Sequence, residues 1–236
     1  MKRKVLSKVG KTTNNSDFDV LPLLPISDMS NRLLRKEMTS TLYEYYLVDD
    51  IGEASDYIEL CDVLRSASPN EEVLIRFNSG GGLLSTGDMI INAINESQAH
   101  VHGFIEHGCG SMATMIFLAC HSWSLSDTSE FFIHSASGGT VGKEHENFAS
   151  TMFARKKLHK MVRNRYAGFL TEKEIENVLN GQDYYFDNEE IGERLETYTE
   201  FQQKKFEAEL EAFQKEQEDD IEGAYIKPKK KKILPS

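Results

Sequence analysis

The chain has 236 residues and a formal net charge of −11, from 27 Lys and Arg against 38 Asp and Glu. Its hydrophobic share of 39% and aromatic share of 10% supply a core and exclude wholesale disorder. The acidic excess disfavours nucleic-acid binding by the body of the protein, because phosphate backbones are also negative. We see no apolar run of membrane-span length and no secretory h-region, so we expect no membrane segment.

The cysteines indicate where the protein works. Cys61, Cys109 and Cys120 are an odd number, without a C-x-x-C pair or a disulfide framework. Such a set is typical of reduced thiols in a reducing compartment. We therefore expect a cytoplasmic protein.

Residues 1–30 are predicted to be a flexible N-terminal arm, because they are polar and show no sustained periodicity. Residues 31–198 are predicted to form one domain. Within it, strand-like segments are expected at 43–48, 73–77, 101–105 and 131–134, and helix-like segments at 54–66, 84–95, 111–120 and 144–166. This alternation predicts β-α-β units and a largely parallel sheet, hence an α/β fold.

Residues 199–236 are predicted to be a C-terminal extension. Residues 200–222 should form an amphipathic helix, because Phe206, Leu210 and Phe213 follow one another at spacings of four and three. The lysine-rich tail that follows is interpreted as solvated, and we assign it no function.

The first glycine-rich turn is Asn78-Ser-Gly-Gly-Gly82, after a strand and before a helix. It does not fit a phosphate-binding loop, because Asp88 stands where the lysine after Gly87 would be required. It does not fit a dinucleotide fingerprint either, because Ser85 occupies the position of the third glycine. The remaining interpretation is a tight turn whose free backbone amides could bind an oxyanion.

The second glycine-rich turn is Gly108-Cys-Gly-Ser-Met112. Ser111 should lie at a helix N-terminus with a free amide after it, and by itself it also fits an ordinary N-cap serine. The G-x-S-x-G elbow of α/β-hydrolases is not matched, because Cys109 and Ala113 stand where that motif has glycine.

Two further residues carry little signal alone. His134 ends a predicted strand, where a histidine is usually structural, and Asp183 is one of many acids. A zinc site from His100, His102, His107 and Cys109 is an alternative, since His100 and His102 would share one strand face. We disfavour it, because the spacing matches no zinc motif and four ligands would crowd into ten residues.

Taken together, these motifs resemble the ClpP family of serine peptidases over residues 42–198. The family's N-S-P-G-G loop is matched at residues 78–82, with Gly80 in place of proline, and its G-x-A-S-M motif at residues 108–112, with Gly110 in place of alanine. The histidine strand M-I-H-Q-P-x-G-G is matched at residues 132–139, and Asp183 stands before an aromatic-rich strand and an acidic helix. The four motifs occur in the family's order and near its spacing.

The resemblance implies the site and the fold. Ser111 would be the nucleophile, His134 its general base and Asp183 the carboxylate that orients the imidazole. The backbone amides of Gly82 and Met112 would form the oxyanion hole, and no cofactor or metal is implied. The implied fold is a ClpP/crotonase-like spiral of β-β-α units with a long handle helix at Lys143–Tyr166, whose apolar positions would be Phe148, Met152 and Met161, plus the C-terminal helical extension.

The resemblance also implies partners. Family members form a heptameric ring or a double heptamer and receive unfolded polypeptide from an AAA+ unfoldase. We therefore expect a homo-oligomeric ring that cleaves unfolded chains. The N-terminal arm would be an axial gate, a cleaved propeptide or simply a disordered segment.

Several alternatives stay open at this point. One is a specialised maturation peptidase of the same fold, for example in viral head assembly, and another is a catalytically silent scaffold subunit of a mixed ring. A Ser–Lys peptidase does not account for His134. A crotonase-like acyl-CoA enzyme accounts for neither His134 nor Asp183.

Overall fold

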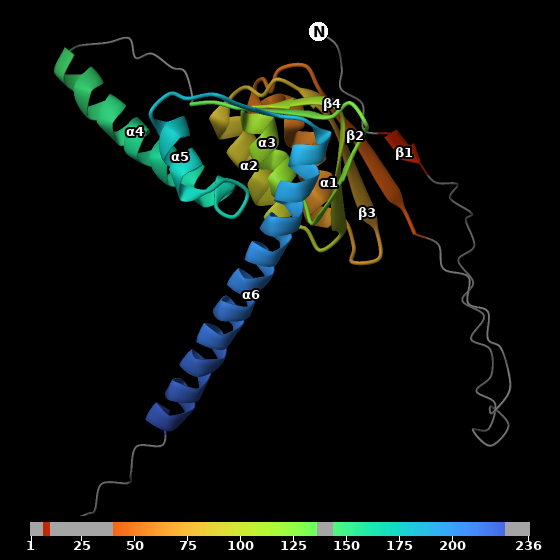
Figure 1. The fold of residues 1–236 in the computed structure, drawn as a ribbon. Coiled ribbons are helices and arrows are strands. Elements are labelled where there is room, and N and C mark those ends of the chain that lie inside the picture. The colour runs from red at the N-terminus through yellow and green to blue at the C-terminus, as the bar shows by residue number, and fades with distance from the viewer. Residues whose placement is uncertain (1–6, 10–39, 136–143, 225–236) are drawn as a thin grey trace, which may run out of the picture.

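The computed structural model describes residues 7–9, 40–135 and 144–224, and the side chains of residues 40–135, 150–215 and 217. These residues form a mixed α/β structure around one sheet, with helices against it and two long helices that extend from the body (Figure 1). The strands are β1 Ser7–Val9, β2 Leu42–Val48, β3 Glu72–Ser79, β4 His100–Gly110, β5 Ser122–Leu125, β6 Glu130–Ile133 and β7 Tyr184–Phe186. The helices are α1 Ile58–Ser66, α2 Leu84–Glu96, α3 Met112–Leu118, α4 Glu144–Tyr166, α5 Glu172–Leu179 and α6 Asn188–Ala224, and a short 3-10 helix, Ala54–Tyr57, precedes α1.

The sheet has the strand order β1-β2-β3-β4-β6-β7, with β5 also paired to β4. Strands β2, β3, β4, β5 and β6 pair in parallel, which confirms the predicted parallel core. Strand β1, inside the predicted arm, pairs antiparallel with β2, and β7 pairs antiparallel with β6. The rest of the predicted arm lies outside the described residues. A spiral arrangement of the units stays a prediction.

The central strands form because apolar side chains alternate along them. In β3, Val73, Ile75 and Phe77 are fully buried, and the residues between them face the other side of the sheet. Helix α3 packs on this buried side, where the ring of Phe117 meets Phe77 edge-on with centroids 5.3 Å apart. Every residue of α3 is buried. The core therefore lies directly beneath the end of β4, where Ser111 follows.

Strand β4 has two partners along the same edge. Residues His102–Ile105 pair with β5, and residues Gly108–Gly110 pair with β6. The strand is therefore longer than the 101–105 segment that its apolar pattern predicts. The second half of β4 ends directly before Ser111. It pairs with β6, which ends directly before His134.

Helices α4 and α6 extend beyond the sheet and helices α1–α3 (Figure 1). Helix α4 lies within the segment for which a handle helix is predicted, with Met152 53% exposed and Met161 half-buried, and its role as a handle stays a prediction. Lys143 and the side chain of Phe148 lie outside the described residues. Helix α6 is continuous over 37 residues, so the predicted domain boundary at residue 199 lies inside one helix.

Candidate active site

Ser111 lies at a strained turn between β4 and α3. Its φ of 49° and ψ of −122° place a residue other than glycine in a region that L-amino acids seldom occupy. Its amide donates to the carbonyl of Phe132 at 2.7 Å, which ties the turn to β6. Such a conformation persists only when surrounding contacts hold it, and strain of this kind is enriched at functional sites.

The two glycine-rich turns touch each other. Gly81 has a φ of +102°, and a Cβ atom there would lie 2.7 Å from the Cβ of Ser111 and 2.9 Å from the Met112 nitrogen. A Cβ atom at Gly110 would lie 2.9 Å from the carbonyl oxygen of Gly80. Glycine at these positions therefore permits close approach of two backbones. This close contact with the Gly80 carbonyl explains why position 110 has a glycine.

The backbone amides of Gly82 and Met112 lie near this contact, and neither takes part in the hydrogen bonds of the adjoining bridge or helix. Gly82 is bridged to Ile51, but the hydrogen bonds run from the Ile51 amide to the Gly81 carbonyl and from the Leu83 amide to the Ile51 carbonyl. The Gly82 amide takes no part in either. Met112 is the first residue of α3, so its amide has no acceptor within the helix.

Ser111, His134 and Gly82 line one cavity of about 660 Å³. Ser85, in the first turn of α2, lines it as well and is exposed. Neither Asp183 nor Met112 is among the residues that line this cavity. The structure therefore brings three of the five predicted site residues to one space.

The pairing of β6 with β7 ends next to His134 and Asp183. The antiparallel register ends with the pair Ile133 and Tyr184; His134 follows that pair on one side and Asp183 precedes it on the other, so a continued register would set them opposite each other. Residues opposite each other in an antiparallel pair point to the same face, with Cβ atoms typically about 4.5–5.5 Å apart. Asp183 is exposed, and His134 is half-buried.

The imidazole of His134 is held by aromatic stacking. Its ring lies 4.7 Å from that of Phe132, and the Phe132 ring lies 4.7 Å from that of Tyr185 on β7. Among the described residues, no hydrogen bond joins Ser111 to His134 or His134 to Asp183. Catalytic hydrogen bonds in free enzymes are often long and tighten only when substrate binds.

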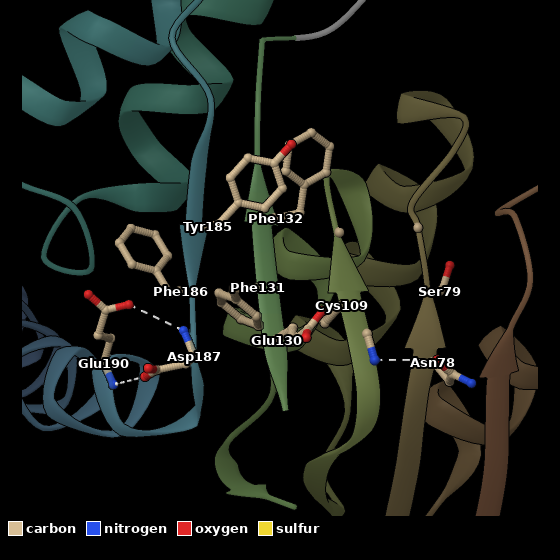
Figure 2. Close-up of a pocket in the computed structure, with 13 residues that line it drawn as sticks. Asn78, Ser79, Cys109, Glu130, Phe131, Phe132, Tyr185, Phe186, Asp187 and Glu190 are labelled. Atoms are coloured by element: carbon tan, nitrogen blue, oxygen red, sulfur yellow. Dashed lines mark hydrogen bonds between the residues drawn. The ribbon is translucent and has the colours of Figure 1, made fainter. Parts of the chain in front are cut away.

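A second cavity of about 650 Å³ adjoins the first at Gly80, which lines both. Phe132 and Tyr185 form its aromatic wall, and Figure 2 shows their rings side by side. Asp187 and Glu190 also line this cavity, but their carboxylates are engaged in a capping box at the start of α6. The Glu190 carboxylate accepts a hydrogen bond from the Asp187 amide at 3.2 Å, and the Asp187 carboxylate accepts one from the Glu190 amide at 2.9 Å. The cavity therefore offers mainly apolar surface next to the Ser111 turn.

Two residues that the sequence analysis did not identify support the Ser111 turn. The Thr114 hydroxyl donates its one proton to the Ser111 carbonyl at 2.7 Å. It must therefore accept the hydrogen bond, also 2.7 Å long, that joins it to the buried hydroxyl of Tyr166, the last residue of α4. Thr114 interrupts an apolar helix three residues after Ser111, which is a usable sequence signal. The partnership with Tyr166 spans 52 residues and leaves no local signal.

Cys109 is not a competing nucleophile. It is 2% exposed, and burial raises the pKa of its thiol well above the ordinary value, with nearby Cys120 adding to the shift. The reactive thiolate is therefore disfavoured. This result contrasts with Ser111, which opens to a cavity.

The histidines of the alternative zinc site are engaged elsewhere. His102 contacts the hydroxyls of Ser122 and Ser124 at 2.6 Å and 2.7 Å, and His100 contacts Ser122 at 2.7 Å. Across residues 7–9, 40–135 and 144–224, no group of three or more His, Cys, Asp or Glu residues could hold a metal ion. The helices in the same ranges include none that is long and apolar enough to cross a membrane.

A comparison with known protein families identifies the family of this chain. The family model described as Clp protease matches residues 28–193, which is more than half of the chain. No curated protein matches the chain. The matched range runs from before β2 to the first turns of α6 and contains both glycine turns, His134 and Asp183. The chain therefore belongs to the Clp protease family.

Proposed function

We propose that this ClpP-like peptidase is a serine endopeptidase that uses Ser111, His134 and Asp183 as its triad. In this mechanism, Ser111 Oγ attacks the peptide carbonyl while His134 takes the hydroxyl proton and later gives it to the leaving amine. Asp183 holds the imidazole in the required tautomer and stabilises the imidazolium that forms. Water then hydrolyses the Ser111 ester by the reverse sequence of proton transfers.

The oxyanion of the tetrahedral intermediate would be bound by the amides of Gly82 and Met112. Neither amide is used by the neighbouring ladder or helix, and the close approach of Gly81 to the Met112 nitrogen brings the two turns together. Preorganised donors of this kind typically contribute about a hundred- to a thousandfold each to the rate.

The observation that supports this proposal is the strained Ser111, which lines one cavity with His134, the residue that follows β6. Ser111 and His134 come from separate elements and line the same cavity, and Asp183 stands one residue before the strand that pairs with β6. The proposal extends to assembly and substrate. By analogy with the family, we propose a homo-oligomeric ring that cleaves unfolded polypeptide in the cytoplasm, supplied by an AAA+ unfoldase. The three buried free cysteines fit a reducing compartment.

The test is hydrolysis of unfolded casein and of a short fluorogenic peptide. Asp183→Asn should lower kcat by about a thousand- to ten-thousandfold, because the imidazole loses the partner that sets its tautomer. Asp127→Asn, at an exposed site in the loop before β6, is the matched control and should keep wild-type activity. Wild-type turnover by Asp183→Asn would remove Asp183 from the triad.

A further inference from the structure

Two adjoining cavities lie between the C-terminal half of α4 and residues 198–205 of α6. The smaller cavity, of about 380 Å³, is lined by residues of α2, α3, α4 and α6 and by the segment after α3. The larger, of about 710 Å³, is lined mainly by α4 and α6. Arg165, Gln202 and Lys205 line both, so the two cavities adjoin, and we name them together the α4–α6 groove.

The α4–α6 groove is basic in a chain whose net charge is −11. Its lysines and arginines are Lys157, Lys160, Arg165 and Lys205. Among the described residues that line it, Asp88 is the one carboxylate, and it lies 3.9 Å from Arg165, at the outer limit of an ion pair. Positive charge gathered in one hollow raises the local concentration of anions there.

The lysines of the groove are weakly matched by carboxylates. Neither Lys157 nor Lys160 lies within ion-pair distance of a carboxylate in the described part of the chain. Lys205 lies 4.0 Å from Glu209, one turn further along α6, and both side chains are more than half exposed. An exposed pair of this kind contributes little and leaves the ammonium group available to a ligand.

The smaller cavity supplies hydrogen-bond donors as well as charge. Its lining includes no Asp or Glu from the described residues, and it includes three side-chain amides, those of Asn95, Asn164 and Gln202. His121 lines it too, and the Val101 amide donates to His121 Nδ1 at 2.9 Å, so the proton of the neutral ring lies on Nε2. Together with the forked guanidinium of Arg165, these donors suit the oxygens of a phosphoryl group.

Contacts of α6 with the body hold this groove in place. The Tyr198 hydroxyl donates to the carbonyl of Leu118, at the end of α3, at 3.2 Å. Phe201 packs on Gly168 in the turn after α4, where φ is +87° and a Cβ atom would lie 2.7 Å from the Phe201 Cβ. Lys205 follows Phe201 by one helical turn, so these two anchors fix its backbone beside α4.

We propose that the α4–α6 groove binds a small anion with two or more linked phosphoryl groups, one at Arg165 and Lys205 and another at Lys157 and Lys160. A single phosphate carries about two negative charges at pH 7, which is fewer than the four cations present. None of the residues that line the Ser111 cavity lines the groove, so the proposal does not depend on the proposed triad.

The test is isothermal titration calorimetry of the full chain with sodium triphosphate at constant ionic strength. We expect saturable binding at one site per chain, and weaker binding in about 0.5 M salt, where exposed charges are screened. Citrate should bind at least about tenfold more weakly, because it has fewer negative charges. Absence of saturable binding, or citrate binding as tightly as triphosphate, would overturn the proposal.

The same titration with adenosine triphosphate distinguishes the source of the phosphoryl groups. Binding as tight as that of inorganic triphosphate, or tighter, assigns the groove to a nucleoside polyphosphate. Weaker binding assigns it to an inorganic polyphosphate, because the nucleoside then adds no favourable contact. Either result requires that inorganic triphosphate itself binds.

Neutral substitutions locate the site. Lys205→Gln should weaken triphosphate binding about tenfold, because a charged donor to the phosphoryl oxygens is lost. Lys204→Gln is the matched control, since Lys204 is 77% exposed and lines neither cavity. Equal losses in the two variants would show general charge attraction and would overturn the site.

A second pair of variants tests the far end of the groove. Lys157→Gln/Lys160→Gln should weaken binding about tenfold, whereas Arg155→Gln/Lys156→Gln, at exposed positions outside the groove, should leave it unchanged.

The carboxylate of the groove gives a prediction of opposite sign. Asp88→Asn should strengthen triphosphate binding severalfold, because it removes a negative charge that faces the ligand and releases Arg165 from its ion pair. Weaker binding by Asp88→Asn, with helical content unchanged by circular dichroism, would contradict a phosphate site at Arg165.

Discussion

The amide of Ser111 donates to the carbonyl of Phe132 at 2.7 Å, and Phe132 lies on β6, two residues before His134, which directly follows that strand. One backbone hydrogen bond thus joins the turn of the proposed nucleophile to the strand that its proposed base directly follows. The ring of His134 stacks on that of Phe132 at this point, with centroids 4.7 Å apart. Ser111 and His134 each directly follow the end of a sheet strand, β4 and β6, and these two strands pair with each other.

Close approach of the two glycine turns predicts the effect of Gly81→Ala. The new methyl group would meet the Ser111 Cβ at 2.7 Å in a backbone conformation with φ of +102°. The Ser111 turn must then shift, so we expect kcat to fall by about a hundredfold or more and the free energy of unfolding to fall by about 1–3 kcal/mol.

The matched control is Gly192→Ala in α6, where a Cβ meets nothing within 4 Å. It should keep activity and raise stability by up to about 1 kcal/mol, because alanine is the better helix former. Undiminished peptidase activity in Gly81→Ala would show that the contact does not set the site. Peptide hydrolysis and urea denaturation measure the two effects.

Removing the buried hydroxyl of Tyr166 should act on turnover through the Ser111 carbonyl. In Tyr166→Phe, the Thr114 hydroxyl loses its donor, and the Ser111 carbonyl loses the long 3.5 Å contact from the Tyr166 hydroxyl and keeps its bond from Thr114. We expect the free energy of unfolding to fall by about 1 kcal/mol and kcat to fall severalfold with KM unchanged. Tyr46→Phe, on a side chain that is 43% exposed, is the control. A rise in KM at constant kcat would contradict a role in positioning Ser111.

His102 should make the protein less stable in mild acid. Burial, and then the neighbouring His100, lower the pKa of His102, while Glu72 acts in the opposite direction. Below the unfolded pKa of about 6.5, the unfolded chain therefore binds protons more readily than the folded one, so stability falls as pH decreases. Above that pH both states are neutral at this residue and the effect disappears.

The measurement is urea denaturation at pH 7.5, 6.5 and 5.5. His102→Gln should lose less stability between pH 7.5 and 5.5 than the wild type, although it gives up contacts with Ser122 and Ser124 at every pH. Parallel curves for the two proteins would show that His102 does not carry the pH dependence.

Local patterns were enough to predict the central strands and the glycine turns. Strand β3 follows from the alternation of Val73, Ile75 and Phe77, which the structure buries completely. Strand β5 could not be predicted, because Ser-Trp-Ser-Leu is four residues long and half-buried throughout. Its place is fixed by pairing with β4, which is a tertiary effect.

The site was predictable to a different extent. Ser111, His134 and Gly82 could be chosen from motif order, and the structure places all three around one cavity. The stacking of His134 on Phe132 and the support from Tyr166 depend on side chains brought together by the fold. No spacing in the sequence encodes such contacts. The catalytic roles proposed for Ser111, His134 and Asp183 need activity and labelling experiments.

The most direct test of the proposed peptidase is intact-mass analysis after treatment with a fluorophosphonate. We predict one adduct on the wild type and on Ser85→Ala, whose serine lines the same cavity, and none on Ser111→Ala. In His134→Ala labelling should slow markedly, because the serine loses its general base. Absence of any adduct on folded wild type, or an adduct that persists in Ser111→Ala, would contradict the assignment of Ser111 as an activated nucleophile.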